Sequence, residues 1–297
     1  MWFRNLRFYT FSDRFELPEN FEQLLAEHPF HSCSRQELAS YGWYSPFGGD
    51  HEVLTHRVGN NVLLCARKEE KVLPASAVNA QLEDKVATIS AAEGRPVNRK
   101  EKQTLKEDLI HSMLPQAFSK YQLTWAYISL DQQMIAIDAS SANRAEEMLA
   151  LLRGSLSSLA VKPLLSEQPA EVILTQWLKD QALPKDFAFG DEAELRDPAA
   201  DGAILRCRQQ ELTTPEMLGH LEHDKQVTKL GLEWQERLTF VLESDLALKR
   251  LKLTDVAEND RDDLVDPTPE QRIDSDFALL SSEVNALFPA LQKAFNS

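Results

Sequence analysis

The alternation of apolar and polar residues over 226–253 constrains the fold of this 297-residue chain more than any other feature. The runs VTKLGLEW, RLTFVL and LALKRLKL each alternate with the two-residue period of a strand that has one buried face. Glu243, Ser244 and Asp245 supply turn residues between the second run and the third. The pattern predicts a three-stranded meander, which is an antiparallel arrangement.

Helical periodicity is interleaved with such strands elsewhere in the chain. Residues 75–92 and 99–114 place apolar side chains at helical spacing, and Gly94 and Pro115 end the two runs. Three more helices are predicted at 142–159, 170–179 and 276–295, and a short helix is predicted to start at Thr214-Pro215. The predicted strands are a hairpin at 52–67, a strand pair at 123–138 and a single strand at 202–208. The spacing is not that of regular βαβ units, so we expect an α+β fold with a mixed or antiparallel sheet core and a helical arm.

The charge is distributed unevenly. The chain carries a net charge of -15, yet residues 57–125 hold 11 Lys and Arg against 8 Asp and Glu. Residues 255–276 hold nine acids and two arginines. A polyanion requires a local basic surface, not a basic total, so this asymmetry points to a surface that faces a polyanion. The alternative is that these charge runs are ordinary solvated faces.

The sequence lacks the motifs of several classes of enzyme and of membrane-spanning proteins. The sequence contains no GxxxxGK[ST], GxGxxG, GxSxG or HExxH motif, and no apolar run of about 18 residues. Its three cysteines lie far apart, as in a protein of a reducing compartment. We therefore expect a cytoplasmic protein that is not an enzyme and has no cofactor, metal or membrane partner. Asp260, Asp262 and Asp263 resemble a divalent-metal cluster, but a solvated loop is the favoured interpretation.

Four groups of basic residues remain, and none matches a base-reading motif. In a regular strand, Lys249 and Arg250 point to opposite faces. Scattered cations suit phosphate contacts, which give affinity without specificity, and stacking platforms for single strands are not evident. The candidate contacts to duplex DNA are Arg67, Lys68, Lys71, Arg95, Arg99, Lys100, Lys102, Lys106, Lys225, Lys229, Lys249, Arg250 and Lys252.

Longer segments resemble the RdgC family of recombination-associated proteins, in order and over nearly the whole chain. The most specific is Leu63-Leu64-Cys65-Ala66-Arg67-Lys68-Glu69-Glu70-Lys71-Val72-Leu73-Pro74. Supporting segments are Gly42-Trp43-Tyr44-Ser45-Pro46, His111-Ser112-Met113-Leu114-Pro115, Leu149-Ala150-Leu151-Leu152-Arg153, Asp191-Glu192-Ala193-Glu194-Leu195, Val227-Thr228-Lys229-Leu230-Gly231-Leu232 and Leu248-Lys249-Arg250-Leu251-Lys252.

The resemblance implies a ring-shaped homodimer with a basic central hole that binds double-stranded DNA without sequence preference and opposes RecA. It implies a nucleoid-associated protein whose helical arm makes one dimer contact through Leu114, Pro115 and Phe118. Gln116 departs from the Arg that many relatives have, which puts the DNA contribution of this tip in doubt. The expected regions are a central sheet at 1–74 and 121–168, the arm at 75–120, a second peripheral region at 169–225, and the meander, acidic loop and C-terminal helix at 226–297.

Two other functions stay open. One is an inhibitor that contacts a recombinase directly, with its acidic surface as a DNA mimic. The other is a metal-dependent nuclease that uses the cluster at Asp260, Asp262 and Asp263.

Overall fold

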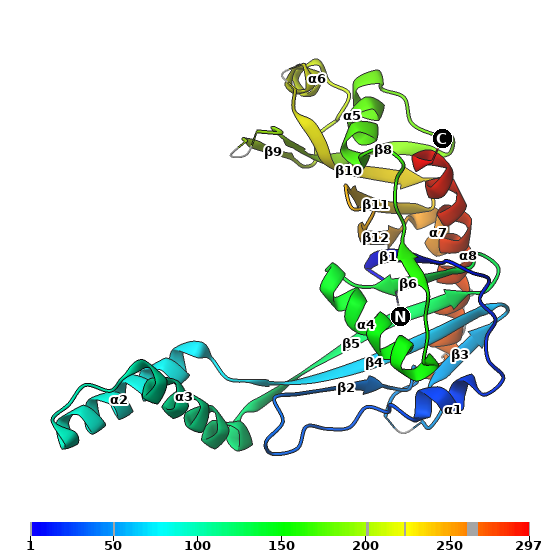
Figure 1. Cartoon of the computed structure of the whole chain (residues 1–297). Coiled ribbons are helices and arrows are strands. Elements are labelled where there is room, and N and C mark those ends of the chain that lie inside the picture. Colours follow the sequence, from blue (N-terminus) through cyan, green and yellow to red (C-terminus); the bar gives the residue numbers. More distant parts are fainter. Residues whose placement is uncertain (1, 50, 200–201, 223, 260–266, 297) are drawn as a thin grey trace. The chain divides into compact units, whose positions relative to one another are not determined.

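The structure is a computed structural model that describes residues 2–49, 51–199, 202–222, 224–259 and 267–296. The chain divides into two compact units, which we describe separately. Unit 1 comprises Met1–Glu27, Ser45–Cys65 and Thr124–Ser297, and unit 2 comprises His28–Tyr44 and Ala66–Leu123. Two long strands, β4 (Asn61–Val72) and β5 (Phe118–Ser129), contribute residues to both units (Figure 1).

Unit 1 is built on an antiparallel sheet. From β5, the strand order continues β6-β1-β12-β11-β10-β8-β9, and each neighbouring pair is antiparallel. Two short strands complete the sheet, β3 beside β4 and β7 beside β1. The strands are β1 (Asn5–Phe11), β3 (Thr55–Val58), β6 (Met134–Asp138), β7 (Val161–Pro163), β8 (Phe187–Arg196), β9 (Ile204–Cys207), β10 (Gln226–Trp234), β11 (Leu238–Glu243) and β12 (Leu248–Leu253).

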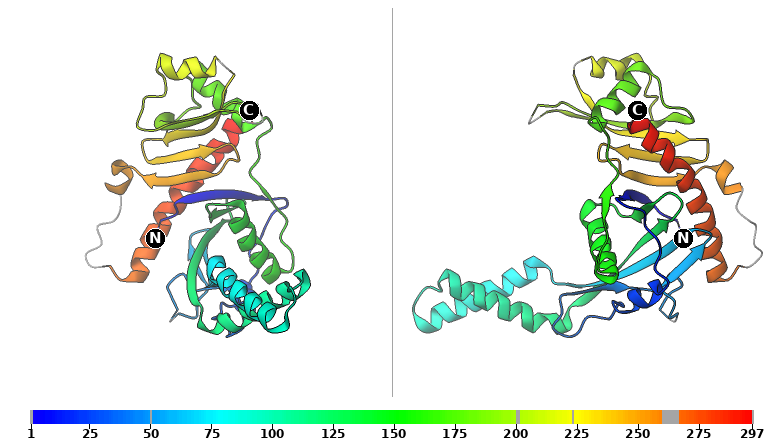
Figure 2. Two further views of the ribbon diagram at one scale, coloured as in Figure 1. Left: turned by 90° about the vertical axis from the view of Figure 1, so that its left-hand side faces the viewer. Right: turned by 45° about the vertical axis from the view of Figure 1, so that its right-hand side comes forward.

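A long C-terminal helix, α8 (Pro269–Phe295), covers one face of this sheet (Figure 2). Its start is fixed by a capping box in which the Thr268 hydroxyl accepts from the backbone of Gln271 and the Gln271 side chain accepts from the backbone of Thr268. Phe277, Leu280, Val284, Leu287 and Phe288 form its buried stripe. Phe288 packs on Phe8 of β1 with the ring centroids 5.2 Å apart, and burial of such a ring stabilises the fold by about 1.5–3 kcal/mol.

A second helix, α5 (Ala170–Asp180), lies on the same face as α8. The Thr175 hydroxyl of α5 accepts a hydrogen bond of 2.8 Å from the backbone of Val227 in β10, and Trp177 packs on Phe295 of α8. The shorter helices of this unit are α1 (Phe21–Ala26), α6 (Pro215–Leu221) and α7 (Asp255–Asn259). Among the described helices, none is long and apolar enough to cross a membrane.

The opposite face of the sheet is covered only in part. Because side chains alternate along β1, Tyr9 points away from the α8 side that Phe8 occupies, and its hydroxyl bonds to Glu146 of α4 (Ala142–Leu156). Burial and the nearby Glu146 carboxylate raise the pKa of Tyr9 to about 12. Over β8 to β12, no described helix covers this face (Figure 1). The sheet therefore presents an open polar surface there.

Unit 2 combines the outer part of the sheet with a helical hairpin. In it, β2 (Ala39–Trp43) pairs with the second half of β4. The hairpin consists of α2 (Ala75–Glu93) and α3 (Arg99–Met113), followed by a short 3-10 turn, η1 (Leu114–Gln116). Gly94 ends α2 in the left-handed conformation, and the Asn98 side chain caps α3 by accepting from Glu101 at 2.9 Å.

The structure confirms most of the predicted elements, including the meander, the 52–67 hairpin and the two helices of the arm. It also confirms an α+β fold with a large antiparallel sheet. The predicted start of the last helix at residue 276 is wrong, because the capping box starts α8 at Pro269. The polar stretch after residue 255 begins with a helix, α7, and the long strand β8 was not predicted. The regional boundaries expected from the resemblance stay predictions.

Candidate nucleic-acid interface

The open face of β8 to β12 in unit 1 carries a group of interleaved charges. Lys229 of β10 pairs with Glu243 at 3.1 Å and with Glu194 at 3.7 Å. Lys249 of β12 pairs with the same Glu243 at 3.5 Å. Arg250 pairs with Glu192, two residues before Glu194 on β8. Shared carboxylates thus place these lysines and this arginine on one surface.

The prediction that Lys249 and Arg250 face opposite ways is wrong, and a β-bulge is the reason. Thr239 opposes Lys252 and Val241 opposes Lys249, so Phe240 alone faces two residues of β12. Arg250 takes up the extra residue with a left-handed φ of 53°, and Leu251 turns into the core instead. The bulge therefore brings Lys249, Arg250 and Lys252 to the same face.

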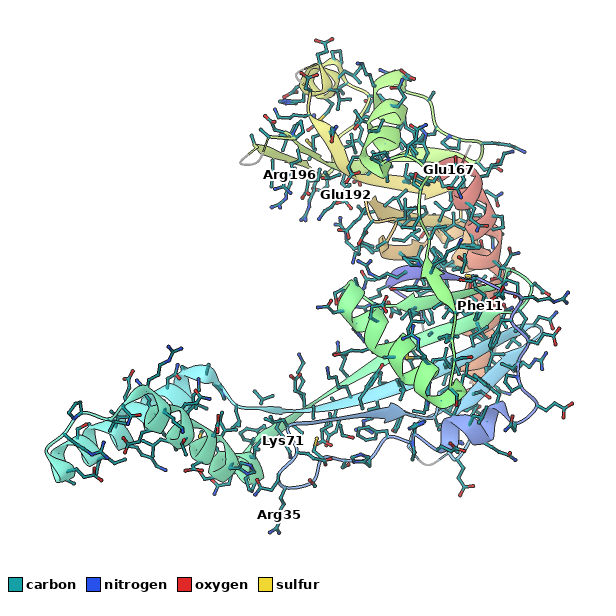
Figure 3. The ribbon with its side chains drawn as sticks, viewed as in Figure 1. Phe11, Arg35, Lys71, Glu167, Glu192 and Arg196 are labelled. Atoms are coloured by element: carbon teal, nitrogen blue, oxygen red, sulfur yellow. The ribbon has the colours of Figure 1, made fainter. Side chains whose placement is uncertain are left out.

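Three arginines that were not among the predicted contacts also belong to this face. Arg206 of β9 pairs with Glu194 at 2.7 Å, and Arg208 lies 3.8 Å from Glu192. Arg196 at the end of β8 borders the same hollow as Glu194 and Lys229 (Figure 3). A signal for two of them was present, since Arg206 and Arg208 alternate with the inward-facing Leu205 and Cys207 of a predicted strand.

We call this surface the basic face. It carries seven cations interleaved with four carboxylates, in a chain of net charge -15. Asp191 lies beside Glu192 and Arg208, and Asp197 and Asp245 border the same hollow as Arg196, so with these three acids the carboxylates also number seven. The cations are Arg196, Arg206, Arg208, Lys229, Lys249, Arg250 and Lys252. The carboxylates are Glu192, Glu194, Glu233 and Glu243.

An open groove of about 560 Å³ crosses the basic face from β8 to β12. Its floor includes Gly190 and Gly231, where β8 and β10 approach closely at an irregularity in their register. A Cβ atom on Gly231 would lie 2.9 Å from the carbonyl oxygen of Glu192. Only glycine therefore allows this approach, which sets the depth of the groove.

The neighbours of Glu194 stabilise its ionised form. Partial burial alone would raise the pKa of Glu194, but the hydrogen bond from Arg206, the charge of Lys229 and a hydrogen bond from Thr228 lower it overall. Five cations of the basic face, Arg206, Arg208, Lys229, Lys249 and Arg250, are held in ion pairs that an incoming anion has to displace.

The predicted cations of unit 2 have different surroundings. The Arg67 guanidinium lies over three aromatic rings, those of Tyr121 at 4.4 Å and of Phe30 and Tyr44 at 4.9 Å each. Lys71 donates to the Ser119 hydroxyl and lies 3.8 Å from the buried Glu69.

In the arm of unit 2, Arg95 pairs with Glu93 and Glu101 at 2.6 and 2.9 Å. Arg99, Lys100 and Lys102 are exposed along the first turns of α3, and within the described residues none of the three makes an ion pair. Lys106 follows on the same helix and is half-buried. Lys68 lies next to Arg67 on β4, and Lys225 precedes β10 in unit 1.

The residues expected at the dimer contact differ in exposure. Leu114 is buried inside unit 2, whereas Pro115 is exposed and Phe118 is 86% exposed. Tyr121 and Leu123, on the same strand as Phe118, are also exposed.

In the described part of the chain, no group of three or more His, Cys, Asp or Glu side chains lies close enough together to hold a metal ion. The candidate cluster at Asp260, Asp262 and Asp263 lies outside the described residues.

Comparison with known proteins gives one consistent result. A family model described as "Putative exonuclease, RdgC" matches residues 1–297. The "Recombination-associated protein RdgC" of Aeromonas hydrophila is 43% identical over 292 residues, which is 98% of this chain and 96% of that protein. Proteins of the same name from Tolumonas auensis and Yersinia pestis are 41% and 42% identical over 295 residues, which is 99% of this chain and 98% and 97% of theirs. This chain belongs to the RdgC family.

Proposed function

We propose that this protein binds double-stranded DNA without reading its sequence and thereby limits the access of RecA to DNA. The observation that carries the proposal is the basic face, an uncovered sheet surface that gathers seven cations in an otherwise acidic chain. A phosphate backbone binds such a surface by releasing its condensed counterions. The acidic remainder of the chain favours this face over other orientations.

Lack of sequence specificity follows from the side chains that this face offers. Lysine and arginine on a sheet face reach phosphate oxygens, which are the same at every base pair. The cations also remain near their glutamate partners, so they act as a diffuse charge and not as bidentate readers of single bases. A surface of this kind binds and orients a duplex but does not distinguish one DNA sequence from another.

We further propose that two copies associate and that the exposed Phe118 contributes to the contact. The exposed cations of α3, Arg99, Lys100 and Lys102, would then supply a second group of phosphate contacts. The name of the three relatives supports a role in recombination. A recombinase cannot use duplex that is already covered, and a protein that covers duplex would be located at the nucleoid.

The experiment is a titration of one duplex, and of a second of unrelated sequence, at several salt concentrations. We expect equal affinities for both, and a slope of log K against log salt that decreases by about 0.9 for each phosphate that the protein no longer neutralises. The variant Arg206→Gln/Arg250→Gln/Lys252→Gln removes three cations of the basic face, so its slope should flatten by about 2.7. Arg99→Ala/Lys100→Ala/Lys102→Ala tests the arm separately.

The matched control is Lys179→Gln/Lys293→Gln, which removes two exposed cations from α5 and α8 on the covered face. Its slope should equal that of the wild type. Absence of duplex binding at low salt would refute the proposal. Inhibition of strand exchange that persists with DNA in large excess would instead support direct contact with the recombinase.

A further inference from the structure

A second hollow adjoins the basic face of unit 1. It has a volume of about 550 Å³ and is lined by Trp2, Arg4, Arg250, Lys252, Leu253 and Glu258, among others. Arg250 and Lys252 also line the groove across the basic face, so the two hollows are adjacent. The volume lies within the range of about 300–1,000 Å³ that is usual for small-ligand sites.

The wall that bears the tryptophan is held in place by backbone contacts. The Trp2 indole nitrogen donates to the carbonyl oxygen of Leu251 at 3.2 Å, and the Leu251 amide donates to the carbonyl of Arg4 at 2.9 Å. The amides of Arg4 and Asn5 in turn donate to one carboxylate oxygen of Asp138, at 3.1 and 2.8 Å. These bonds fix the half-buried indole ring in position before any ligand arrives.

Cations predominate among the described residues that line this hollow. Arg4, Arg250 and Lys252 line it together with one described carboxylate, that of Glu258. Arg4 and Lys252 are exposed, and within the described residues neither makes an ion pair. Unlike most cations of the basic face, these two side chains can therefore bind an anion without displacing a glutamate.

We propose that this hollow binds one unpaired nucleotide of DNA, with the base stacked on Trp2 and its phosphate held by Arg4 and Lys252. An aromatic ring beside exposed cations suits a ligand that carries a flat apolar ring and an anionic group together. A base inside a duplex is stacked on both sides and cannot reach the indole, so the site selects frayed ends and single-stranded extensions. The inference rests on the proposed function, because the duplex on the adjoining face delivers the nucleotide.

The test compares a blunt 20-base-pair duplex with the same duplex carrying three unpaired nucleotides at one end. Because stacking of one base on an aromatic ring is worth roughly five- to 150-fold in affinity, we expect the extended duplex to bind about tenfold more tightly. Trp2→Leu, which keeps an apolar side chain, should abolish this difference and leave the affinity for the blunt duplex within about twofold. The matched control, Trp177→Phe, alters a tryptophan that packs on Phe295 and should keep the preference.

Two further measurements separate the possible failures. Single-stranded tetrathymidylate should quench part of the protein's tryptophan fluorescence in the wild type but not in Trp2→Leu. Lys252→Gln changes an exposed side chain and should reduce the preference without affecting the melting temperature.

Equal affinity for blunt and extended duplexes, or a preference that Trp2→Leu retains, would overturn the nucleotide site. Loss of blunt-duplex binding with Trp2-dependent binding of the extended strand would refute the proposed function and leave this site standing.

Discussion

Neutralising Glu194 should strengthen DNA binding, although the residue lies within the proposed DNA surface. Its carboxylate lies 2.7 Å from the Nε atom of Arg206 and 3.7 Å from the Nζ atom of Lys229, and phosphates must compete with it for both cations. Glu194→Gln releases Arg206, whereas Lys229 stays paired with Glu243 at 3.1 Å. Exposed ion pairs are worth about 0.2–1 kcal/mol each, so the cost of freeing one cation falls by about that amount. That corresponds to a gain in affinity of about 1.4- to 5-fold.

The salt dependence supplies a second, independent magnitude. One additional cation open to phosphates should steepen the slope of log K against log salt by up to about 0.9. The assay is a fluorescence-anisotropy titration of one labelled duplex between roughly 50 and 200 mM salt, a range over which such slopes are readily resolved. Gln keeps one amide oxygen that can accept from Arg206, and its amide nitrogen can donate to the Thr228 hydroxyl in place of the second carboxylate oxygen.

The matched control is Glu167→Gln, which removes the same charge from an exposed loop residue before α5 (Figure 3). Both variants have the same net charge, so a gain confined to Glu194→Gln is a local effect. Equal affinities and slopes for the two variants would refute the reasoning. Because the pKa of Glu194 is lowered, mild acidification to about pH 5 should not reproduce the gain.

Four other outcomes can be checked directly. Gly231→Ala should lower the free energy of unfolding by about 1–3 kcal/mol in a denaturant titration and weaken duplex binding, because its Cβ would lie 2.9 Å from the Glu192 carbonyl oxygen. Thr268→Ala removes the capping box of α8 and should cost about 1 kcal/mol, measurable in the same titration, whereas Thr268→Ser should not. The hydrogen bond from Ser119 lowers the pKa of Glu69 in the folded protein, despite burial. Glu69 therefore stabilises the fold at pH values above 4.5, its pKa in the unfolded chain, and this contribution is lost as the pH falls through the lower pKa of the folded state. Glu69→Gln should make unfolding in acid, monitored by circular dichroism, less steep. End-labelled duplex should stay intact with Mg²⁺, and cleavage that Asp260→Asn/Asp262→Asn/Asp263→Asn abolishes would favour a nuclease instead.

The sequence was sufficient to predict those elements whose apolar residues keep a single period. The meander and the two arm helices are of this kind, and the structure confirms them. Strand β8 was not predicted, because Gly190 and Asp191 interrupt its apolar alternation. The apolar residues on either side are Phe187, Phe189, Ala193 and Leu195. The irregular pairing of β8 with β10 accommodates the interruption. The early start of α8 has a sequence signal, Thr268-Pro269 followed by Gln271, although the first turn lacks an apolar stripe.

Side-chain direction was harder to predict than strand position. One inserted residue at Arg250 moves every later side chain of the strand to the opposite face of the sheet. No local pattern in Leu248-Lys249-Arg250-Leu251 indicates this bulge. Likewise, nothing in the spacing indicates that the Arg67 guanidinium lies among three aromatic rings from separate segments. Such contacts depend on tertiary pairing, which sequence periodicity does not contain.

Under the proposed function, the interleaving of cations with glutamates would let an acidic protein bind DNA without sequence preference and still release it. Seven unopposed cations on one face would bind any duplex tightly at low salt and release it slowly. Carboxylates on the same face compete with the phosphates at short range, so at the five paired cations a phosphate binds by displacing an existing ion pair. The exchange lowers affinity at these cations, whereas Lys252 remains open to a phosphate. A protein that must cover DNA and later yield it to other proteins is served better by this arrangement than by a purely basic surface.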